Sequence, residues 1–416
     1  MSARGRNIPE LPTGYLLGKF EVLRLLARDG QAYVYLARLA DSQRKPAARL
    51  LQHLGPGRIT PAQVAAERLC AIKLAAPGWV ESLRDEHSFL LRSEMRHPRL
   101  ISLFADPRTS TNVARPKDER RPGFAILRDS NGVELELPFL ALVYLPGGSL
   151  KELLERRGRR PLPAPVAVAI ARQVAEALVQ LHTQAGIIHH DVSPSNIVLR
   201  QPLSPLVPRV PDCVLIDLAA ADMPGKPRRT QIYGRKTYLP PERLQDKPGS
   251  HGPQVDVYGL GVVLYELLTG QLPRTGTDTI TGTPLPLPPI REHAPALSNQ
   301  LVTLVDAAVE ADPLGRPTLS QFIGALERAP EARGRAQLRA DGFWRAAAPL
   351  IALLALLILS GALLASRPAR LAPQPAPTAL PTLTALPTRT TQPTRTPPAP
   401  TSTPLSDAPA PSDYEL

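Results

Sequence analysis

The sequence reads HHDVSPSN from His189 to Asn196 and IDLA from Ile216 to Ala219. Each stretch holds an Asp among short polar or apolar neighbours. Alone, each is a weak signal, because single Asp and Asn residues usually cap turns. Their weight comes from position, since other short motifs stand in a fixed order before and after them. The fold prediction depends on that order.

Five further motifs flank these two stretches in the chain. They are LARDGQAYVY (Leu26–Tyr35), CAIK (Cys70–Lys73), YLPPE (Tyr238–Glu242), DVYGLG (Asp256–Gly261) and DPLGRP (Asp312–Pro317). The ordered set resembles the eukaryotic-like, or Hanks-type, protein kinase family, and bacterial membrane-anchored Ser/Thr kinases in particular. The resemblance covers about Leu16 to Arg328, which is essentially a whole catalytic domain.

The hydrophobic patterns predict two halves of different structure. Runs rich in Val, Tyr, Leu and Ile predict strands at Phe20–Leu26, Ala32–Leu39 and Leu69–Leu74. Later, Val166–Leu181 has one apolar face and Val257–Leu268 is apolar all round, which predicts an amphipathic helix and a buried helix. A strand-rich start followed by helices indicates an α+β fold, here a two-lobed kinase-like one with a β-rich N-lobe and an α-rich C-lobe.

The resemblance implies that ATP is the phosphate donor. Phosphoryl transfer requires the phosphates of ATP to be neutralised and held in line with the acceptor hydroxyl. By resemblance, Lys73 holds the α- and β-phosphates and is oriented by an ion pair from the following helix. Glu86 is the candidate partner. Because Glu86 lies two residues farther from His97-Pro98 than the family usually shows, Asp85 or a shifted helix is the alternative.

The same resemblance assigns the metal ligands and the proton acceptor. Asp217 would coordinate Mg²⁺, Asn196 would serve the second metal site, and Asp191 would accept the proton of the substrate hydroxyl. Two hard oxygen ligands together with phosphate oxygens suit Mg²⁺. His189 and His190 are adjacent, so their side chains diverge. With no third ligand evident, we expect a structural role for His189 rather than a metal site.

The nucleotide base would lie between the two lobes. The resemblance places the hinge in LALVYLPG (Leu140–Gly147), where backbone groups of Val143 and Leu145 would face adenine and Leu142 would be the gatekeeper. Three apolar side chains would form the walls around the base: Leu26, Val34 and Ala71.

The loop that should cradle the phosphates departs from the family pattern. Its glycine positions are Ala27, Asp29 and Ala32, and only the neighbouring Gly30 remains as a nucleotide-binding candidate. Glycine matters here because backbone N–H groups must approach the phosphates closely, in conformations that a Cβ disfavours. Asp29 also brings negative charge toward the phosphates. We therefore expect Asp29 to weaken nucleotide binding or to force the loop away.

Further departures lie beside Asp191. Ser193 stands where Ser/Thr kinases usually carry a lysine that contacts the γ-phosphate, and Arg235 stands where they usually carry a threonine. We expect Arg235, or alternatively Lys236, to supply the positive charge that Ser193 lacks in the catalytic site. His190 replaces the arginine that reads out phosphorylation of the activation segment, which argues against gating by phosphorylation.

Other parts of the domain carry structural expectations. Glu242 and Arg316 resemble the buried ion pair that ties the family's activation segment to the lower lobe. Three polar, proline-rich or basic insertions separate the motifs, and we expect surface loops there. They are Ala40–Glu67, Asp106–Pro138 and Gln201–Pro211.

Composition limits the other classes of protein. The 416 residues carry a formal net charge of +12, 49 prolines and two cysteines, Cys70 and Cys213. Two cysteines exclude a disulfide scaffold and a four-cysteine zinc site, and they suit a reducing compartment. The positive charge suits polyanions. Because no nucleic-acid-binding module is recognisable, we expect the anionic inner leaflet of a membrane rather than nucleic acid as the partner.

The C-terminal part predicts a membrane anchor. Residues 346–366 are uncharged and mostly apolar, and their length matches the ~30 Å hydrocarbon core of a bilayer. More arginines precede this span than follow it, which predicts a cytoplasmic N-terminal side. The Pro- and Thr-rich residues 367–416 are expected to form a disordered, extracytoplasmic tail.

Five segments follow from these patterns. They are an N-terminal extension (1–15), a protein-kinase-like domain (16–328), a basic juxtamembrane segment (329–345), a transmembrane helix (346–366) and the tail (367–416). We expect an ATP- and Mg²⁺-dependent Ser/Thr protein kinase in the cell membrane, acting on protein substrates. Small residues Gly361 and Ala365 would permit a homodimer through the span.

The alternative is a pseudokinase, a membrane adaptor whose kinase fold binds partners. The altered loop and Ser193 favour the adaptor. Four retained residues favour the enzyme: Lys73, Asp191, Asn196 and Asp217.

Overall fold

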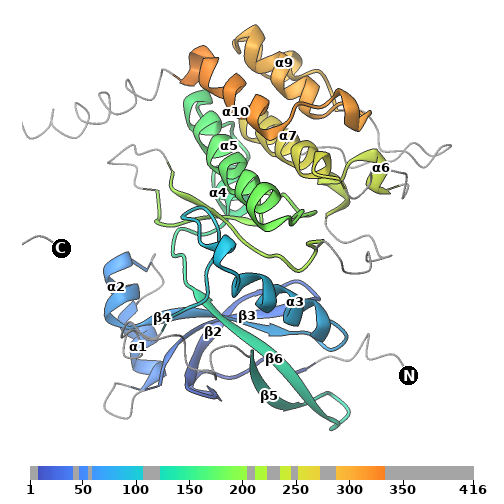
Figure 1. The fold of residues 1–416 in the computed structure, drawn as a ribbon. Helices are drawn as coiled ribbons and strands as arrows, with labels where there is room; N and C mark the ends of the chain where they lie inside the picture. Colours follow the sequence, from blue (N-terminus) through green and yellow to red (C-terminus); the bar gives the residue numbers. More distant parts are fainter. Residues whose placement is uncertain are drawn as a thin grey trace, which may run out of the picture. The chain divides into compact units, whose positions relative to one another are not determined.

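The computed structural model describes residues 8–40, 46–54, 59–105, 122–203, 211–222, 235–244, 252–271 and 287–332. The chain divides into two compact units, Met1–Leu356 and Leu357–Leu416, and every described residue belongs to the first. The described residues form a strand-rich half followed by a helix-rich half (Figure 1). This is the α+β architecture that the sequence predicts.

A six-stranded sheet forms the first half. Its strands are β1 (Leu16–Leu17), β2 (Phe20–Arg28), β3 (Ala32–Leu39), β4 (Leu69–Ala75), β5 (Gly123–Arg128) and β6 (Glu134–Val143). Neighbouring strands are antiparallel, in the order β1-β2-β3-β4-β6-β5. The predicted strands coincide with β2, β3 and β4 to within two residues at each end. The hairpin between β2 and β3 therefore brings the altered loop to one end of the sheet.

The first insertion is not a surface loop, so that prediction is wrong. It contains two helices, α1 (Ala47–Leu54) and α2 (Pro61–Ala66), and α2 begins with a capping box between Thr60 and Gln63. Apolar residues of the insertion are buried in a cluster with residues of β2, β3 and β4: Ala47, Leu50, Leu54 and Ile59 with Leu23, Leu36 and Leu69. Leu50 and Leu54 lie four residues apart and so share one face of α1.

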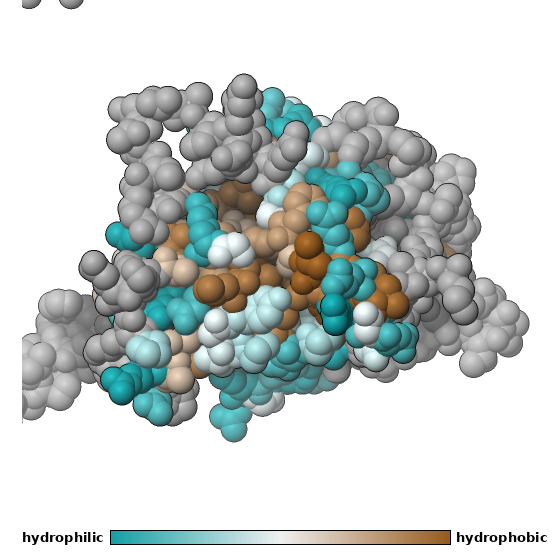
Figure 2. All heavy atoms as spheres, turned by 90° about the horizontal axis from the view of Figure 1, so that it is seen from below, coloured by the Kyte–Doolittle hydropathy of each residue, from teal (hydrophilic) through white to brown (hydrophobic). Residues whose placement is uncertain are grey.

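The second insertion also holds regular structure, because β5 and the start of β6 lie within it. Residues 106–121 of this insertion and 204–210 of the third lie outside the described residues. In the β5–β6 hairpin, the apolar side chains of Phe124, Ile126 and Val133 are exposed. Figure 2 shows the molecule from the sheet side, where hydrophobic residues gather near the centre of the view.

Helix α3 (Val80–Leu90) lies against β6 and buries Leu83, Phe89 and Leu90. A 3₁₀ turn, η1 (Ser93–Met95), follows it. The chain then runs beside β6, where the N–H of Phe104 donates to the carbonyl of Ala141 at 2.9 Å. This helix matters for the site because it carries Glu86 on its buried side.

The second half is mainly helical. Its elements are α4 (Leu150–Arg156), α5 (Ala164–Val179) with the π-helical turn η3 (Gln180–Ala185), the strand pair β7 (Ile197–Leu199) and β8 (Cys213–Leu215), η4 (Lys236–Tyr238), α6 (Pro241–Leu244), α7 (Gln254–Thr269), α8 (Ile290–His293), α9 (Asn299–Ala308), η5 (Pro313–Gly315) and α10 (Leu319–Arg328). Every residue of α7 from Val255 to Thr269 is buried, as its apolar composition predicts. A Cβ at Gly259 would lie 3.0 Å from the carbonyl oxygen of Val192, so glycine permits this close approach.

One described helix, Ala164–Ala185, is long and apolar enough to cross a membrane by length and composition alone. In its most apolar window, 61% of the residues are buried, and α5 packs against α7 and α10. It is therefore the core helix of the second half, and such a helix is weak evidence for a membrane span. The predicted span 346–366 and the tail 367–416 lie outside the described residues.

Candidate active site

A cavity of about 600 Å³ lies between the sheet and the helical half. The predicted base-binding residues line it together with the gatekeeper candidate: Leu26, Val34, Ala71, Leu142, Val143 and Leu145. The N–H of Val143 donates to the carbonyl of Ser102 at 3.1 Å, which fixes the end of β6 beside the cavity. Ile59 adds an apolar lining residue that the sequence did not suggest. The volume falls within the range of small-molecule sites, about 300–1,000 Å³.

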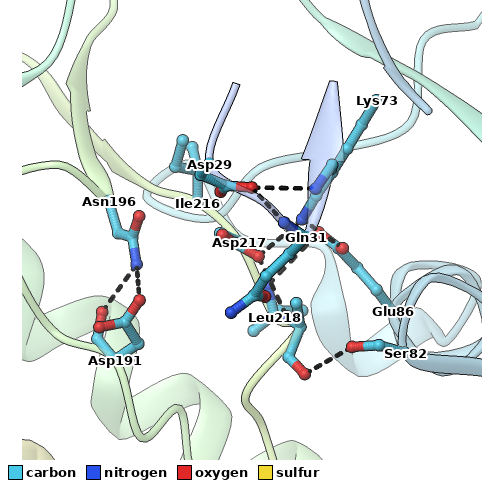
Figure 3. Close-up of polar contacts among 12 residues, drawn as sticks. Asp29, Gln31, Lys73, Ser82, Glu86, Asp191, Asn196, Ile216, Asp217 and Leu218 are labelled. Atoms are coloured by element: carbon cyan, nitrogen blue, oxygen red, sulfur yellow. Dashed lines mark hydrogen bonds and ion pairs between the residues drawn. The ribbon is translucent and has the colours of Figure 1, made fainter. Parts of the chain in front are cut away.

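Lys73 on β4 lies between two carboxylates. Its Nζ is 2.6 Å from Oε2 of Glu86 on α3 and 2.6 Å from Oδ1 of Asp217, which follows β8 (Figure 3). Glu86 makes the predicted contact, which settles the choice between Glu86 and Asp85.

These three charges shift one another's pKa values. Burial favours neutral Lys73, but the charges of Asp217 and Glu86 outweigh burial and hold the pKa of Lys73 above its ordinary value. Burial would raise the pKa of Asp217, yet the adjacent Lys73 ammonium lowers it. Complete burial raises the pKa of Glu86. Lys73 thus stays charged at neutral pH, as a phosphate-binding cation must.

The segment around Asp217 is fastened to α3. The N–H of Leu218 donates to Oε1 of Glu86 at 3.3 Å, and Oγ of Ser82 donates to the carbonyl of Ala219 at 2.8 Å. Asp217 itself has a φ of +68°, in the left-handed region that non-glycine residues adopt at a cost. These contacts from α3 hold Asp217 in that conformation beside Lys73.

Asp191 and Asn196 form a second polar pair. The side-chain nitrogen of Asn196 donates to the carbonyl oxygen of Asp191 at 2.9 Å and to its Oδ2 at 2.7 Å. The amide oxygen of Asn196 points away from Asp191 in Figure 3. Burial and the charge of Asp217 raise the pKa of Asp191. A raised pKa suits a carboxylate that accepts a proton.

His189 has the structural role that the sequence predicts. Its Nδ1 accepts the backbone N–H of Asp191 at 3.2 Å, which leaves Nε2 to donate to the carbonyl of Ile216 at 3.1 Å. One ring thus joins the segment that carries Asp191 to the segment that carries Asp217. Among the described residues, no group of three or more His, Cys, Asp or Glu side chains is arranged to hold a metal ion.

Asp256 on α7 anchors the backbone around His189. Its two carboxylate oxygens accept the N–H groups of His189 and His190, each at 2.8 Å, and Oδ2 also lies 2.7 Å from Nε2 of His182. Burial would raise the pKa of Asp256, but the hydrogen bond and charge of His182 lower it to about 2. Asp256 is 1% exposed, so this anchor is wholly internal.

Arg235 contacts both residues that the sequence associates with it. Its backbone N–H donates to Oδ1 of Asp191 at 3.2 Å. Its guanidinium NH1 donates to Oγ of Ser193 at 3.2 Å. Arg235 also lines the cavity. A positive charge therefore stands beside Asp191, as expected from the loss of lysine at position 193. The side chain of the alternative, Lys236, lies outside the described residues.

Two further pairs hold neighbouring segments. Nε2 of buried His190 lies 2.9 Å from Oδ2 of Asp222, so the position of the family's arginine is paired with a carboxylate of this chain. Arg316 forms the predicted buried pair with Glu242, with N–O distances of 2.7 and 2.8 Å. The guanidinium of Arg316 also stacks on Tyr258.

The loop between β2 and β3 is closed by its own acidic residue. Oδ1 of Asp29 accepts the backbone N–H groups of Gln31 and Ala32, each at 2.9 Å (Figure 3). Asp29 and Ala27 line the cavity. Gly30 stands at the exposed tip with a φ of +81°, a conformation that glycine adopts without strain, and it is not among the lining residues.

Comparison with known proteins agrees with this geometry. Residues 134–325 match the family profile described as "Protein kinase domain". The chain carries a protein kinase domain of the Hanks type. The matched region begins at β6 and contains Asp191, Asn196 and Asp217.

The relatives of this kinase domain include bacterial proteins. Serine/threonine-protein kinase PkaA of Streptomyces coelicolor is 30% identical over 202 residues, which are 49% of this chain and 36% of PkaA. Serine/threonine-protein kinase PknL of Mycobacterium tuberculosis is 37% identical over 147 residues, 35% of this chain and 34% of PknL. The chain thus spans about a third of the length of these relatives. The PknI kinase domain of M. tuberculosis superposes with a TM-score of 0.49 at 19% identity, covering 76% of this chain and 98% of that domain.

The residues present fit the ligands that a protein kinase domain implies. Asp217 and the amide oxygen of Asn196 are hard oxygen donors of the kind that Mg²⁺ takes, in a site that also leaves room for phosphate oxygens. The cavity offers apolar walls for a base and the Lys73 cation for phosphates. Among the described lining residues, the group that opposes phosphate binding is the carboxylate of Asp29, on the exposed loop.

Sequence reasoning did not single out Asp256, His182 or Asp222. Asp256 stands in the quoted DVYGLG motif, yet its partners lie more than 60 residues away in the sequence. Only the fold brings these groups together. An Asp placed in a mostly apolar helix is the signal that could have indicated such an anchor, because a buried carboxylate requires partners.

Proposed function

We propose that this chain is an ATP-dependent protein Ser/Thr kinase anchored in a membrane. One observation carries the proposal: Lys73, Glu86 and Asp217 form a single ionic cluster beside the paired Asp191 and Asn196, around one cavity. The names of the matched relatives, both Ser/Thr kinases, support Ser and Thr as the acceptors.

Each residue of the cluster has a chemical task under this proposal. Asp191 accepts the proton of the substrate hydroxyl as that oxygen attacks the γ-phosphorus and the bond to the β-phosphate oxygen breaks. Lys73 and Arg235 offer positive charge to the phosphates, and Glu86 keeps Lys73 in place. Asp217 and Asn196 would hold Mg²⁺, which neutralises phosphate charge when it is bound.

Backbone anchors give this arrangement its fixed geometry. His189 joins the segment of Asp191 to that of Asp217, and Asp256 holds the backbone of His189 and His190. Preorganised groups cost no rearrangement at the moment of reaction. The arrangement therefore favours the enzyme over the adaptor, although the altered loop is the observation that favours a pseudokinase.

The pair His190–Asp222 bears on regulation. In the kinases that this chain resembles, an arginine at the position of His190 responds to phosphorylation of the activation segment. Here the side chain at that position already has a carboxylate of this chain at 2.9 Å. This supports our proposal that activity does not depend on phosphorylation of that segment.

Transfer of labelled γ-phosphate from ATP tests the proposed activity. The full 416-residue chain, purified in detergent, should label generic protein substrates on Ser and Thr. The Asp217→Ala variant should lose about 100-fold or more, because one of the two metal ligands is gone while Glu86 still holds Lys73. Equal labelling by the two proteins, or none by either on several substrates, would reject the enzyme in favour of the adaptor.

Sequence pattern alone supports the proposed membrane topology. In it, residues 346–366 anchor the chain, residues 1–345 are cytoplasmic and the tail is extracytoplasmic. If the span is correct, the full chain stays in the membrane pellet after washing at alkaline pH. A protease added to intact cells should then remove the tail and leave the kinase domain whole. Release of the chain into the supernatant would contradict the span.

A further inference from the structure

Asp29 occupies a position with two unusual features. It stands at one of the loop's three glycine positions, and it is one of the residues that line the cavity. Oδ1 takes the N–H groups of Gln31 and Ala32, at 2.9 Å each. Successive backbone N–H groups that converge on one point form a site for an anionic oxygen. In this chain the anionic oxygen comes from the protein.

A second turn in the same half also has an Asp side chain that accepts backbone N–H groups. In the β5–β6 hairpin, Oδ1 of Asp129 accepts the N–H groups of Asn131 and Val133, also at 2.9 Å each. That turn is not part of the cavity lining. An Asp that caps a turn is therefore a common way to support a hairpin. What distinguishes Asp29 is that it lines the nucleotide cavity.

The charges that line the cavity determine how much the charge of Asp29 changes phosphate binding. The described lining is close to balanced in charge, with five carboxylates (Asp29, Glu86, Glu152, Glu155 and Asp217) and six cations (Arg24, Arg28, Lys73, Lys151, Arg156 and Arg235). Lys73 is already shared between two of those carboxylates. Removing one negative charge near the phosphates therefore changes the balance more than it would in a strongly cationic site.

We propose that the Asp29 carboxylate takes the place of a nucleotide phosphate oxygen at the N–H groups of Gln31 and Ala32, and so lowers the affinity for nucleoside phosphates without affecting the nucleoside. The proposal rests on the proposed function, because it takes ATP as the ligand of the cavity. Asp29 is thus a determinant of nucleotide affinity, and it acts through competition and charge rather than through the shape of the base site.

Binding measurements on the full chain in detergent test this directly. The affinities for adenosine, ADP and ATP are measured by calorimetry with and without Mg²⁺ for the unmodified chain, Asp29→Ala, Asp29→Asn and Asp129→Asn. Asp29→Ala frees both N–H groups, so ATP and ADP should bind about tenfold more tightly, with adenosine within about twofold. Asp29→Asn keeps an acceptor oxygen and loses the charge, so its gain should be smaller. Asp129→Asn should bind all three ligands like the unmodified chain.

The outcomes separate this proposal from the proposed function. If Asp29→Ala binds ATP no more tightly, or binds adenosine and ATP with the same gain, Asp29 only supports the turn and the proposal is wrong. Absence of ATP binding in every variant also contradicts it. If Asp29→Ala gains ATP affinity but no variant transfers phosphate, the proposal stands and the kinase activity fails.

Discussion

The two walls of the cavity are built in different ways. On the helical side, Asp191, Asn196 and Asp217 stand on backbone that buried charged groups fix from behind, Asp256 above all. On the sheet side, the loop from Ala27 to Ala32 is exposed for most of its length and is closed by one carboxylate of its own. The helical wall keeps the Asp and Asn residues of the kinase pattern and departs from it beside Asp191, whereas the loop departs from it at all three glycine positions.

This difference indicates a division of labour. Groups that perform the proposed chemistry are held by contacts that also stabilise the fold, so changing their anchors should cost stability. The loop is held by local contacts, so changing Asp29 should alter affinity and leave the fold intact. A chain of this kind can keep the machinery for transfer while its nucleotide affinity is reduced.

The largest effect is expected at the anchor of the helical wall. Asp256 has a pKa near 2 in the folded chain, against about 3.9 in an unfolded one, so its ionised form stabilises the fold by about 2–3 kcal/mol. Asp256→Asn should therefore lower the free energy of unfolding by at least that amount at neutral pH. Urea titrations from pH 7 to pH 2 measure the difference.

The pH dependence of that difference follows from the sign of the shift. Because the folded pKa is the lower one, the stabilisation is complete above about pH 4 and is lost as the pH falls through 2. The gap between the unmodified chain and Asp256→Asn should close over this window. Asp212→Asn is the matched control, since Asp212 is exposed and its loss should cost less than about 1 kcal/mol. Equal losses for the two variants would contradict the role of Asp256 as a buried anchor of the helical wall.

A smaller effect is expected at Arg235, which stands on the helical wall but faces the cavity. Arg235→Ala should slow phosphate transfer about 10- to 100-fold, because a positive charge beside Asp191 and Ser193 is lost. The ATP dissociation constant should stay within about twofold. Lys236→Ala serves as the control and should leave both quantities unchanged. If Arg235→Ala lost ATP affinity and transfer rate equally, Arg235 would act in nucleotide binding rather than in phosphate transfer.

Several contacts of the candidate catalytic residues could be predicted from the sequence. The cluster of Lys73, Glu86 and Asp217 and the contact of Arg235 with Ser193 follow from motifs whose order implies one fold. For the loop, the sequence predicts only that it departs from the glycine pattern of the family. Whether Asp29 repels a phosphate or replaces it depends on the backbone conformation of the turn, which no motif encodes.

Two other features could not be predicted for related reasons. Asp256 acts through backbone N–H groups that only the fold brings near α7. Helices α1 and α2 lie in a polar, proline-containing segment where the apolar residues are few. Their burial depends on contacts with apolar side chains of β2, β3 and β4. In each case the deciding contact is tertiary, so the local pattern did not identify the partner.

The central claim is that affinity and chemistry lie on opposite walls. Initial rates of phosphate transfer as a function of ATP concentration test it most directly, measured together for the unmodified chain, Asp29→Ala and Arg235→Ala. We predict that Asp29→Ala lowers the KM for ATP about tenfold with kcat within about twofold, and that Arg235→Ala lowers kcat with KM unchanged. A shift of kcat and KM together in both variants would contradict the claim.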